Sequence, residues 1–189
     1  NENLPGFISL SPPARVGGAQ NYGSAFLPAL YQGTAIGALG RPIKDANLQN
    51  LESKRLTSDL QRRQIDFIQE MNRDLKNRQD TNNQIDGVIK SYELAFRMQT
   101  AVPEVVNLKD EDKATHELYG IDKGPSKPFG RLCMTARRLV ERGVRFVQIY
   151  HGGGGAGAWD AHSNVKGNHA SNCAKVDKPI AGLLADLKQ

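Results

Sequence analysis

The sequence predicts an α/β fold, and three neighbouring segments carry this prediction. Residues 144–150 combine β-branched and aromatic side chains and form the clearest strand of the chain. The helical pattern before this strand stops at Gly143, and a glycine-rich loop after it leads into another helical pattern. The order of helix, strand, loop and helix is typical of a parallel sheet covered by helices. The 189 residues, 39% of them apolar, suffice for one hydrophobic core.

The first segment, residues 1–46, is predicted to be loop-rich. Turn-forming residues cluster at positions 11–13, 17–18 and 40–42, and little periodicity is visible between them. Short apolar pieces at Phe7-Ile8 and Phe26-Leu27 could pair as strands. Segments with so little periodicity usually cover a surface or carry functional loops.

Residues 47–103 are predicted to form a helical hairpin. Apolar side chains recur at helical spacings in two runs, which a polar break at residues 80–83 separates. The first run consists of Leu56, Leu60, Phe67, Ile68, Met71 and Leu75. The second run occupies residues 85–99 and is expected to end before Pro103, because proline disfavours helical backbone in the residue that precedes it. We expect both stripes to face the core rather than a cofactor.

Residues 104–125 are predicted to be a charged connector with one short helix at 114–119, closed by Gly120 in a left-handed cap. Residues 126–189 supply the helix, strand, loop and helix of the α/β core. In the last helix, Pro179 either introduces a kink or marks the true start after an Asp177 cap. Since a crossover helix normally delivers the next parallel strand, we expect all four segments to belong to one domain that is truncated at both ends.

The charge pattern argues against nucleic-acid binding as the main function. The net charge is +5, but the excess lies in residues 126–150, which hold six basic residues and one acidic residue. This segment lacks the series of aromatic side chains on which single-strand binders stack bases. Its arginines at 137, 138 and 142 could steer an anionic substrate, although the helix dipole already explains basic residues near a helix C-terminus. Nucleic-acid binding is therefore a minor alternative, and none is expected.

Membrane insertion and cysteine chemistry are not expected either. No stretch approaches the ~20 uninterrupted apolar residues that a bilayer-spanning helix needs. Cys133 and Cys173 lie 40 positions apart and outside any CxxC spacing. We therefore expect two buried thiols rather than a zinc or redox pair.

The loop after the predicted strand contains the candidate metal ligands. Ligands of open α/β sheets gather at the carboxyl ends of the strands, so this loop is the first place to look for a site. Asp160 and His162 are two positions apart, which in extended backbone directs both side chains to the same side. A carboxylate with an imidazole suits zinc, manganese or iron, but a metal needs three or four ligands. His151 and His169 are possible further ligands.

The glycine run at the start of the same loop is a candidate anion-binding site. The backbone N–H groups of Gly152, Gly153 and Gly154 could surround an anion, with the next helix N-terminus adding favourable partial charge. The run matches neither the phosphate loop nor the dinucleotide-binding pattern, so a flexible or closely packed loop is the alternative. No GxSxG motif surrounds Ser163 or Ser171, so no nucleophile is assigned.

Several segments, in this order, resemble the bacterial domain-of-unknown-function 1501 family. They are NLPGF at 3–7, FLPALYQG at 26–33, SYELAFRMQ at 91–99, RLVERGVRFVQ at 138–148, HGGG at 151–154 and WDAH at 159–162. That family is grouped with the alkaline-phosphatase and sulfatase-like superfamily. The resemblance implies an alkaline-phosphatase-like sandwich, here incomplete, and metal-dependent hydrolysis of phosphate or sulfate esters. It also implies export, and hence a periplasmic or extracytoplasmic location.

The resemblance assigns roles to particular residues. Asp160 and His162 match the position of a metal-ligating pair that follows a strand, and His151 and His169 match less closely. The implied metal is a divalent ion such as zinc, calcium, magnesium or manganese, and the implied partner is an anionic ester substrate. The nucleophile and the remaining ligands of that pattern are expected outside residues 1–189, so the isolated chain is expected to be inactive. The alternative is a non-catalytic binding or structural protein that retains the fold.

Overall fold

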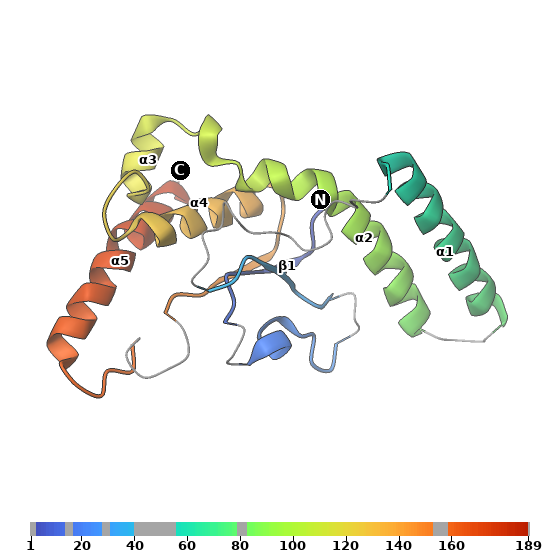
Figure 1. Cartoon of the computed structure of the whole chain (residues 1–189), viewed down its shortest axis with the longest axis horizontal. Coiled ribbons are helices and arrows are strands. Elements are labelled where there is room, and N and C mark those ends of the chain that lie inside the picture. Colours follow the sequence, from blue (N-terminus) through green and yellow to red (C-terminus); the bar gives the residue numbers. More distant parts are fainter. Residues whose placement is uncertain are drawn as a thin grey trace.

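The computed structural model describes residues 3–13, 17–27, 31–39, 56–78, 83–152 and 159–188. In chain order the elements are β1 (Phe7–Leu10), η1 (Gly18–Tyr22), β2 (Thr34–Ile36), α1 (Ser58–Arg78), α2 (Asn83–Val106), η4 (Leu108–Asp110), α3 (Lys113–Tyr119), α4 (Lys127–Glu141), β3 (Phe146–Ile149) and α5 (Val165–Asp186). The predicted α/β class is confirmed. Figure 1 shows the small sheet below α2 and α4, and the α1–α2 hairpin extending to one side.

The sheet has three parallel strands in the order β2-β1-β3. Leu10 is level with Ile36 on one side and with Ile149 on the other, so these side chains share one face of the sheet. The apolar piece at Phe7-Ile8 does form a strand, whereas the suggested strand at Phe26-Leu27 is wrong. Phe26 lies in a turn and its side chain is 93% exposed. Strand β2 has no counterpart among the strands predicted from the sequence.

The hydrophobic core lies between the sheet and two helices. Ile8, Leu10 and Ile36 are fully buried on the face that α2 and α4 cover, while η1 lies against the other face of the sheet (Figure 1). The helices contribute Met98, Val102, Val105, Leu132, Met134 and Leu139. Burial of so many apolar side chains, each worth roughly 2 kcal/mol, is the main stabilising contribution to this part of the fold.

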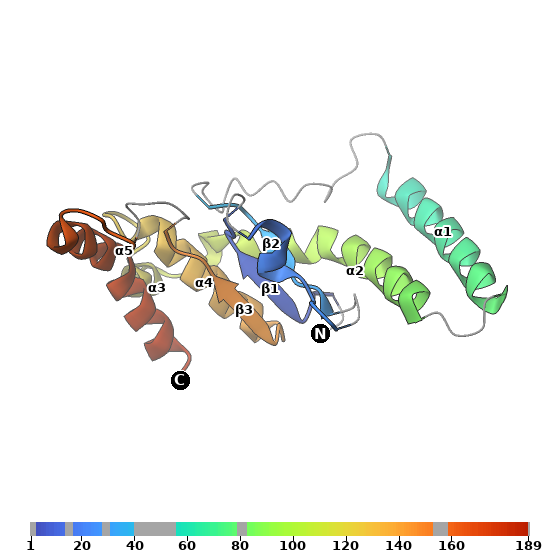
Figure 2. The same cartoon turned by 90° about the horizontal axis from the view of Figure 1, so that it is seen from below.

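The helix α4 is central to the packing, because it contacts β3, α2, α3 and α5. Two glycines allow the helices to approach closely. A Cβ atom on Gly130 would lie 2.2 Å from the carbonyl oxygen of Tyr119, and one on Gly182 would lie 2.7 Å from that of Leu118. Figure 2 shows α3, α4 and α5 together on the β3 side of the sheet.

The predicted helical hairpin is present, but its second helix does not end before Pro103. Helix α2 continues through Pro103 to Val106. Val102 and Val105 are fully buried on either side of the proline, so core packing holds the last turn in helical form. The proline removes one N–H donor from the helix and crowds the carbonyl group four residues earlier, so this packing must offset a cost of roughly 3 kcal/mol.

Most of the first apolar stripe of the hairpin faces solvent, and only its Ile68 is half-buried, which corrects the expectation that the stripe faces the core. Phe67 and Met71 are 63% and 58% exposed, and Leu56, Leu60 and Leu75 are exposed as well. The side of α1 that contacts α2 instead contains the buried Ile65 and Gln69. Gln69 fits there because its Nε2 donates to the carbonyl oxygen of Ile89 at 2.8 Å.

Capping signals mark both ends of α3, whereas the N-cap residues of α4 and α5, Ser126 and Asn164, make no side-chain capping hydrogen bond. In α3, the Asp112 side chain accepts from the Thr115 N–H, and Gly120 closes the helix at φ 63°, as predicted. Helix α5 begins at Val165 and runs past Pro179, so the suggested start after Asp177 is wrong. Pro179 is buried against the neighbouring helices.

Candidate functional site

The carboxyl edge of the sheet is where ligands of parallel α/β sheets usually bind. The chain leaves β1 toward β2, whereas it leaves β3 toward α5, on the other side of the sheet (Figure 2). Connections that diverge from adjacent parallel strands leave a crevice at the strand ends. Tyr150, the first residue after β3, donates its N–H to the Leu10 carbonyl oxygen at 3.1 Å, which holds the two strand ends together.

Ser11 is a residue of this edge that the sequence analysis did not propose as a site residue. It directly follows β1, is buried, and has φ 52°, a left-handed conformation that is uncommon outside glycine. Its N–H donates to the Ile36 carbonyl oxygen at 2.8 Å, so pairing with the neighbouring strand fixes this backbone. Backbone outliers of this kind cluster at functional sites. The only sequence signal was the Ser-Pro-Pro turn.

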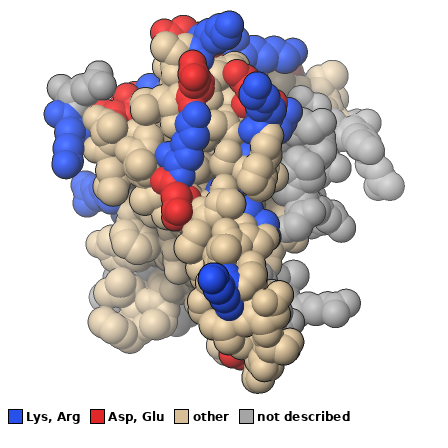
Figure 3. All heavy atoms as spheres, turned by 90° about the vertical axis from the view of Figure 1, so that its left-hand side faces the viewer, with Lys and Arg blue, Asp and Glu red and all other residues tan. Residues whose placement is uncertain are grey.

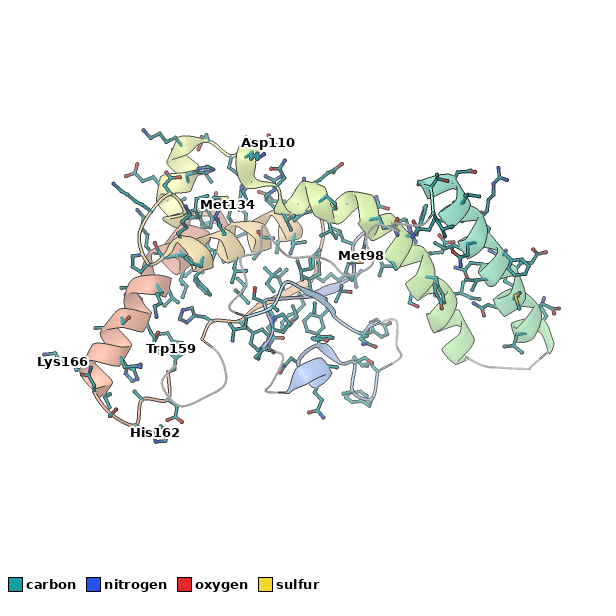
Figure 4. The ribbon with its side chains drawn as sticks, viewed as in Figure 1. Met98, Asp110, Met134, Trp159, His162 and Lys166 are labelled. Carbon is teal, nitrogen blue, oxygen red and sulfur yellow. The ribbon has the colours of Figure 1, made fainter. Side chains whose placement is uncertain are left out.

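Asp160 and His162 lie side by side in the segment before α5. His162 Nε2 is 3.0 Å from Asp160 Oδ2, and the two side chains are 70% and 79% exposed, respectively. The carboxylate and the imidazole therefore lie on the same side, although residues 159–160 and 162–163 form bends rather than the extended backbone that the prediction assumed. Figure 4 shows His162 at the tip of this segment, with its ring directed away from the protein.

His151 and His169 lie apart from this pair and contact Trp159 instead. The Trp159 indole N–H donates to His151 Nδ1 at 3.0 Å, and His169 Nε2 is 3.0 Å from the Trp159 carbonyl oxygen. The His151 ring also meets the edge of Phe129 at a centroid distance of 5.1 Å. Because an indole N–H can only donate, Nδ1 of His151 must be unprotonated. The neutral ring therefore carries its proton on Nε2. Burial and the nearby positive charge of Lys175 lower the pKa of His151, which favours this neutral form.

The described residues bring together two candidate ligands rather than a complete metal site. Within them, no group of three or more His, Cys, Asp and Glu side chains is arranged to hold an ion. Of the proposed anion-binding glycines, Gly152 follows His151 at φ 71°, whereas Gly153 and Gly154 lie outside the described residues. The metal and anion roles remain predictions.

The arginines considered for anion steering are used inside the protein. Arg137 and Arg138 both bind the carboxylate of Glu111, and Arg138 also donates to the Glu104 carbonyl oxygen at 3.0 Å. Arg142 donates to the Arg138 carbonyl oxygen at 3.3 Å. Burial alone would lower the pKa of Arg137, but the carboxylates around it, Glu111 first, raise it above its ordinary value.

The surface on the α3–α5 side carries no continuous basic patch. Figure 3 shows basic and acidic side chains interspersed over its upper half, whereas the lower half is mostly uncharged. Of the two cysteines, Cys133 is buried and Cys173 is half-buried, and both are free thiols. Among the described helices, none has the length and apolar character that a membrane crossing requires.

Comparison with known proteins identifies a family but no relative of known structure or activity. The family model described as "Protein of unknown function (DUF1501)" matches residues 1–189. No curated protein and no solved structure matches the chain.

Proposed function

Since the chain belongs to the DUF1501 family, we propose that it is part of a metal-dependent hydrolase of the phosphatase or sulfatase type that acts on phosphate or sulfate esters. The supporting observation is the contact of Asp160 with His162 beyond the carboxyl end of β3. The proposal includes an alkaline-phosphatase-like sandwich, to which the three parallel strands would belong, and an extracytoplasmic location. Both follow from the sequence resemblance.

The chemistry of the pair fits a divalent ion. The carboxylate oxygen of Asp160 and the imidazole nitrogen of His162 are 3.0 Å apart, so they converge on a common proton. A divalent ion can replace that proton, since zinc and manganese accept both oxygen and nitrogen ligands, whereas magnesium and calcium would favour Asp160. When bound, such an ion polarises an ester oxygen and lowers the pKa of a coordinated water.

His169 and His151 are assigned positioning roles in this proposal. His169 contacts the carbonyl oxygen of Trp159, the residue next to Asp160, and His151 accepts from the Trp159 indole. These two contacts fix Trp159 from both its backbone and its side chain. They thereby restrict the backbone from which the Asp160 carboxylate projects, which is how outer contacts orient metal ligands.

The chain contains a matched control for a metal-binding experiment. His116 Nδ1 lies 3.2 Å from Asp122 Oδ1, a second carboxylate–imidazole contact far from the candidate site in sequence. Zinc and manganese binding is measured by calorimetry for the unmodified protein, Asp160→Asn, His162→Gln and Asp122→Asn. The two site variants are expected to lose about tenfold or more in affinity, and Asp122→Asn is expected to match the unmodified protein. Equal affinity in all four proteins would refute the ligand roles.

The reaction itself is tested on the full-length protein, with nitrophenyl phosphate and nitrophenyl sulfate as substrates. Metal-dependent hydrolysis that Asp160→Asn abolishes supports the proposal. Normal hydrolysis in this variant excludes Asp160 from the reaction. Metal binding without hydrolysis of either ester would favour the second candidate, described next.

The second candidate is a non-catalytic binding or structural protein that retains the fold. The observation that favours it is the exposed apolar side of α1, where Phe67 and Met71 are more than half exposed. Apolar stripes of this kind commonly mark interaction surfaces. This reading predicts that activity is absent while the fold, measured by circular dichroism, is intact.

A further inference from the structure

A groove at the end of the molecule opposite His162 has no role in the proposed hydrolase. It lies where the end of α2, η4, α3 and α4 meet, and its volume is about 470 Å³. In Figure 4, Asp110 marks η4 at the top of the molecule, while His162 lies at the bottom. The groove is lined by Pro103, Val106, Asn107, Leu108, Lys109, His116, Ile121 and Arg131.

Local hydrogen bonds hold the walls of the groove in place. Asn107 Oδ1 accepts from the Lys109 N–H at 3.3 Å and so caps η4. His116 Nε2 is 3.3 Å from the Leu108 carbonyl oxygen, and its Nδ1 is 3.2 Å from Asp122 Oδ1. This imidazole therefore connects η4 to α3 and to the residues that follow α3. A ligand would meet a largely preformed surface, as is usual for small-molecule sites.

The charge of the groove is positive. None of its lining residues is acidic. Among the described residues, neither the Arg131 guanidinium nor the Lys109 ammonium has a hydrogen-bonding or ion-pair partner. The neighbouring arginines of α4 differ in this respect, because Arg137 and Arg138 are both bound by Glu111. Arg131 is thus half-buried, and no internal ion pair among the described residues occupies its guanidinium group, which is available to bind an anion.

The floor of the groove is apolar. Leu108 and Ile121 are buried, and Val106 is half-buried beside Pro103. An occupant must therefore combine an apolar body with a negative charge. A highly charged ion such as free phosphate would leave this apolar floor uncovered, whereas a neutral apolar molecule would leave Arg131 and Lys109 without a counter-charge.

We propose that this groove binds a small organic anion, with its apolar body on Val106, Leu108 and Ile121 and its carboxylate or sulfonate head at Arg131 and Lys109. The planar guanidinium of Arg131 can donate two parallel hydrogen bonds to such a head group. The volume of about 470 Å³ is within the range of small-molecule pockets. The site does not depend on the metal proposal, because none of its residues contributes to the Asp160–His162 pair.

The test uses two probes that differ in charge but only slightly in shape. They are anilinonaphthalene sulfonate and its neutral analogue N-phenyl-naphthylamine. Both are titrated by fluorescence at low salt against the unmodified protein, Arg131→Gln and Lys109→Gln. Arg145→Gln and Lys123→Gln are the controls, since both residues are exposed cations outside the groove. Loss of a charge-assisted contact should weaken sulfonate binding roughly tenfold in each groove variant and leave the controls unchanged.

The neutral probe should bind more weakly than the sulfonate and show no dependence on Arg131. Equal effects of Arg131→Gln and Arg145→Gln, or equal affinity of the two probes, would overturn the proposal. Asp160→Asn should bind the sulfonate normally, so failure of the hydrolase proposal is distinguishable from failure of this one.

A second measurement locates the probe, because the exposed side of α1 could also take up a dye. In amide NMR spectra, the sulfonate should shift the resonances of Asn107, Lys109 and Ile121. Val106→Asp places a carboxylate on the groove floor and should abolish these shifts. Shifts concentrated in α1 would assign the dye to the helix surface and refute the groove. If Val106→Asp does not fold, the shifts of Arg131→Gln decide the question.

Discussion

Among single residues, Gly130 determines how closely α4 can approach the end of α3. An added Cβ atom would lie 2.2 Å from the Tyr119 carbonyl oxygen, and a backbone atom cannot move aside as a side chain can. Gly130→Ala should therefore lower the free energy of unfolding by about 2 kcal/mol, even though alanine is the better helix former. Urea denaturation measures this change.

Gly167 in α5 is the matched control for Gly130. The atoms nearest to an added Cβ at Gly167 belong to the side chain of Asn164, which is exposed and can rotate away. Gly167→Ala should be neutral or stabilising by up to about 1 kcal/mol, as is usual for this change within a helix. If both alanine variants had the same stability, close packing would not be the role of Gly130.

Burial determines the reactivity of Cys133. Desolvation raises the pKa of its thiol to about 12, so almost none of it is thiolate at pH 8. Cys173 is only half-buried. Iodoacetamide at pH 8 should therefore label Cys173 first, and Cys133 should react only in denaturant or as pH approaches its raised pKa. Mass spectrometry of the labelled peptides checks this order, and rapid native labelling of Cys133 would contradict it.

Among the single residues of the candidate site, the sequence predicts some positions and misses others. The proximity of Asp160 and His162 was predicted from their spacing in extended backbone, but residues 159–160 and 162–163 form bends, so the contact has a different local cause from the one predicted. The contacts of His151 and His169 with Trp159 do not follow from any local pattern, because a loop and a helix start bring them together. Ser11 was missed for the same reason, as its neighbours at the sheet edge are distant in sequence.

Among the elements, the hairpin shows what periodicity can and cannot predict. The helical period of residues 58–78 was sufficient to predict α1, but a period does not identify the neighbour that a stripe contacts. Here α2 contacts the more polar side, where Gln69 is buried and Arg62 binds both carboxylate oxygens of Glu93 at 3.0 and 3.1 Å. Hydrogen-bonded polar groups thus replace the apolar contacts that the pattern suggested.

This arrangement gives a direct prediction for α1. Ile65 is buried against α2, so Ile65→Ala should destabilise the hairpin by about 2 kcal/mol. Phe67 is 63% exposed, so Phe67→Ala should cost less than about 0.5 kcal/mol. Hydrogen exchange of the α1 amides measures both effects. The reverse order, with Phe67→Ala the more damaging, would mean that the apolar stripe is covered in solution.

The strands were predicted less well than the helices. All three strands are short, with four, three and four residues, but only β3 follows a helix and a glycine and has a distinctive composition. Their partners are also remote, since Phe7 pairs with Phe146. Parallel pairing over such a separation leaves no local signature, because each strand is stabilised by neighbours that the surrounding sequence does not contain.

At the scale of the whole molecule, an acidic segment and a basic segment that follow each other in the sequence form ion pairs in the fold. Residues 100–125 have an excess of acidic side chains and residues 126–150 an excess of basic ones. Glu111, from the acidic connector, binds both Arg137 and Arg138 of α4, and Asp186 of α5 lies 3.3 Å from Arg137 Nε. Asp186 also accepts from the Tyr119 hydroxyl at 2.7 Å. The network therefore connects the connector, α3, α4 and α5.

Removal of Glu111 should be far more damaging than removal of the exposed partner of the same arginine. The side chains of Glu111, Arg137 and Arg138 are only 14%, 15% and 10% exposed. Glu111→Gln would therefore take the carboxylate away from the nearly buried Arg138 guanidinium and leave Arg137 with Asp186 and the more exposed Glu141. The expected loss in free energy of unfolding is about 3 kcal/mol. Glu141 contacts Arg137 at 3.0 Å but is 49% exposed, and Glu141→Gln should cost less than about 1 kcal/mol. Urea denaturation at low and high salt distinguishes the two, because salt screens the exposed pair more than the buried one. Equal losses for both variants would show that the connector does not hold these helices together.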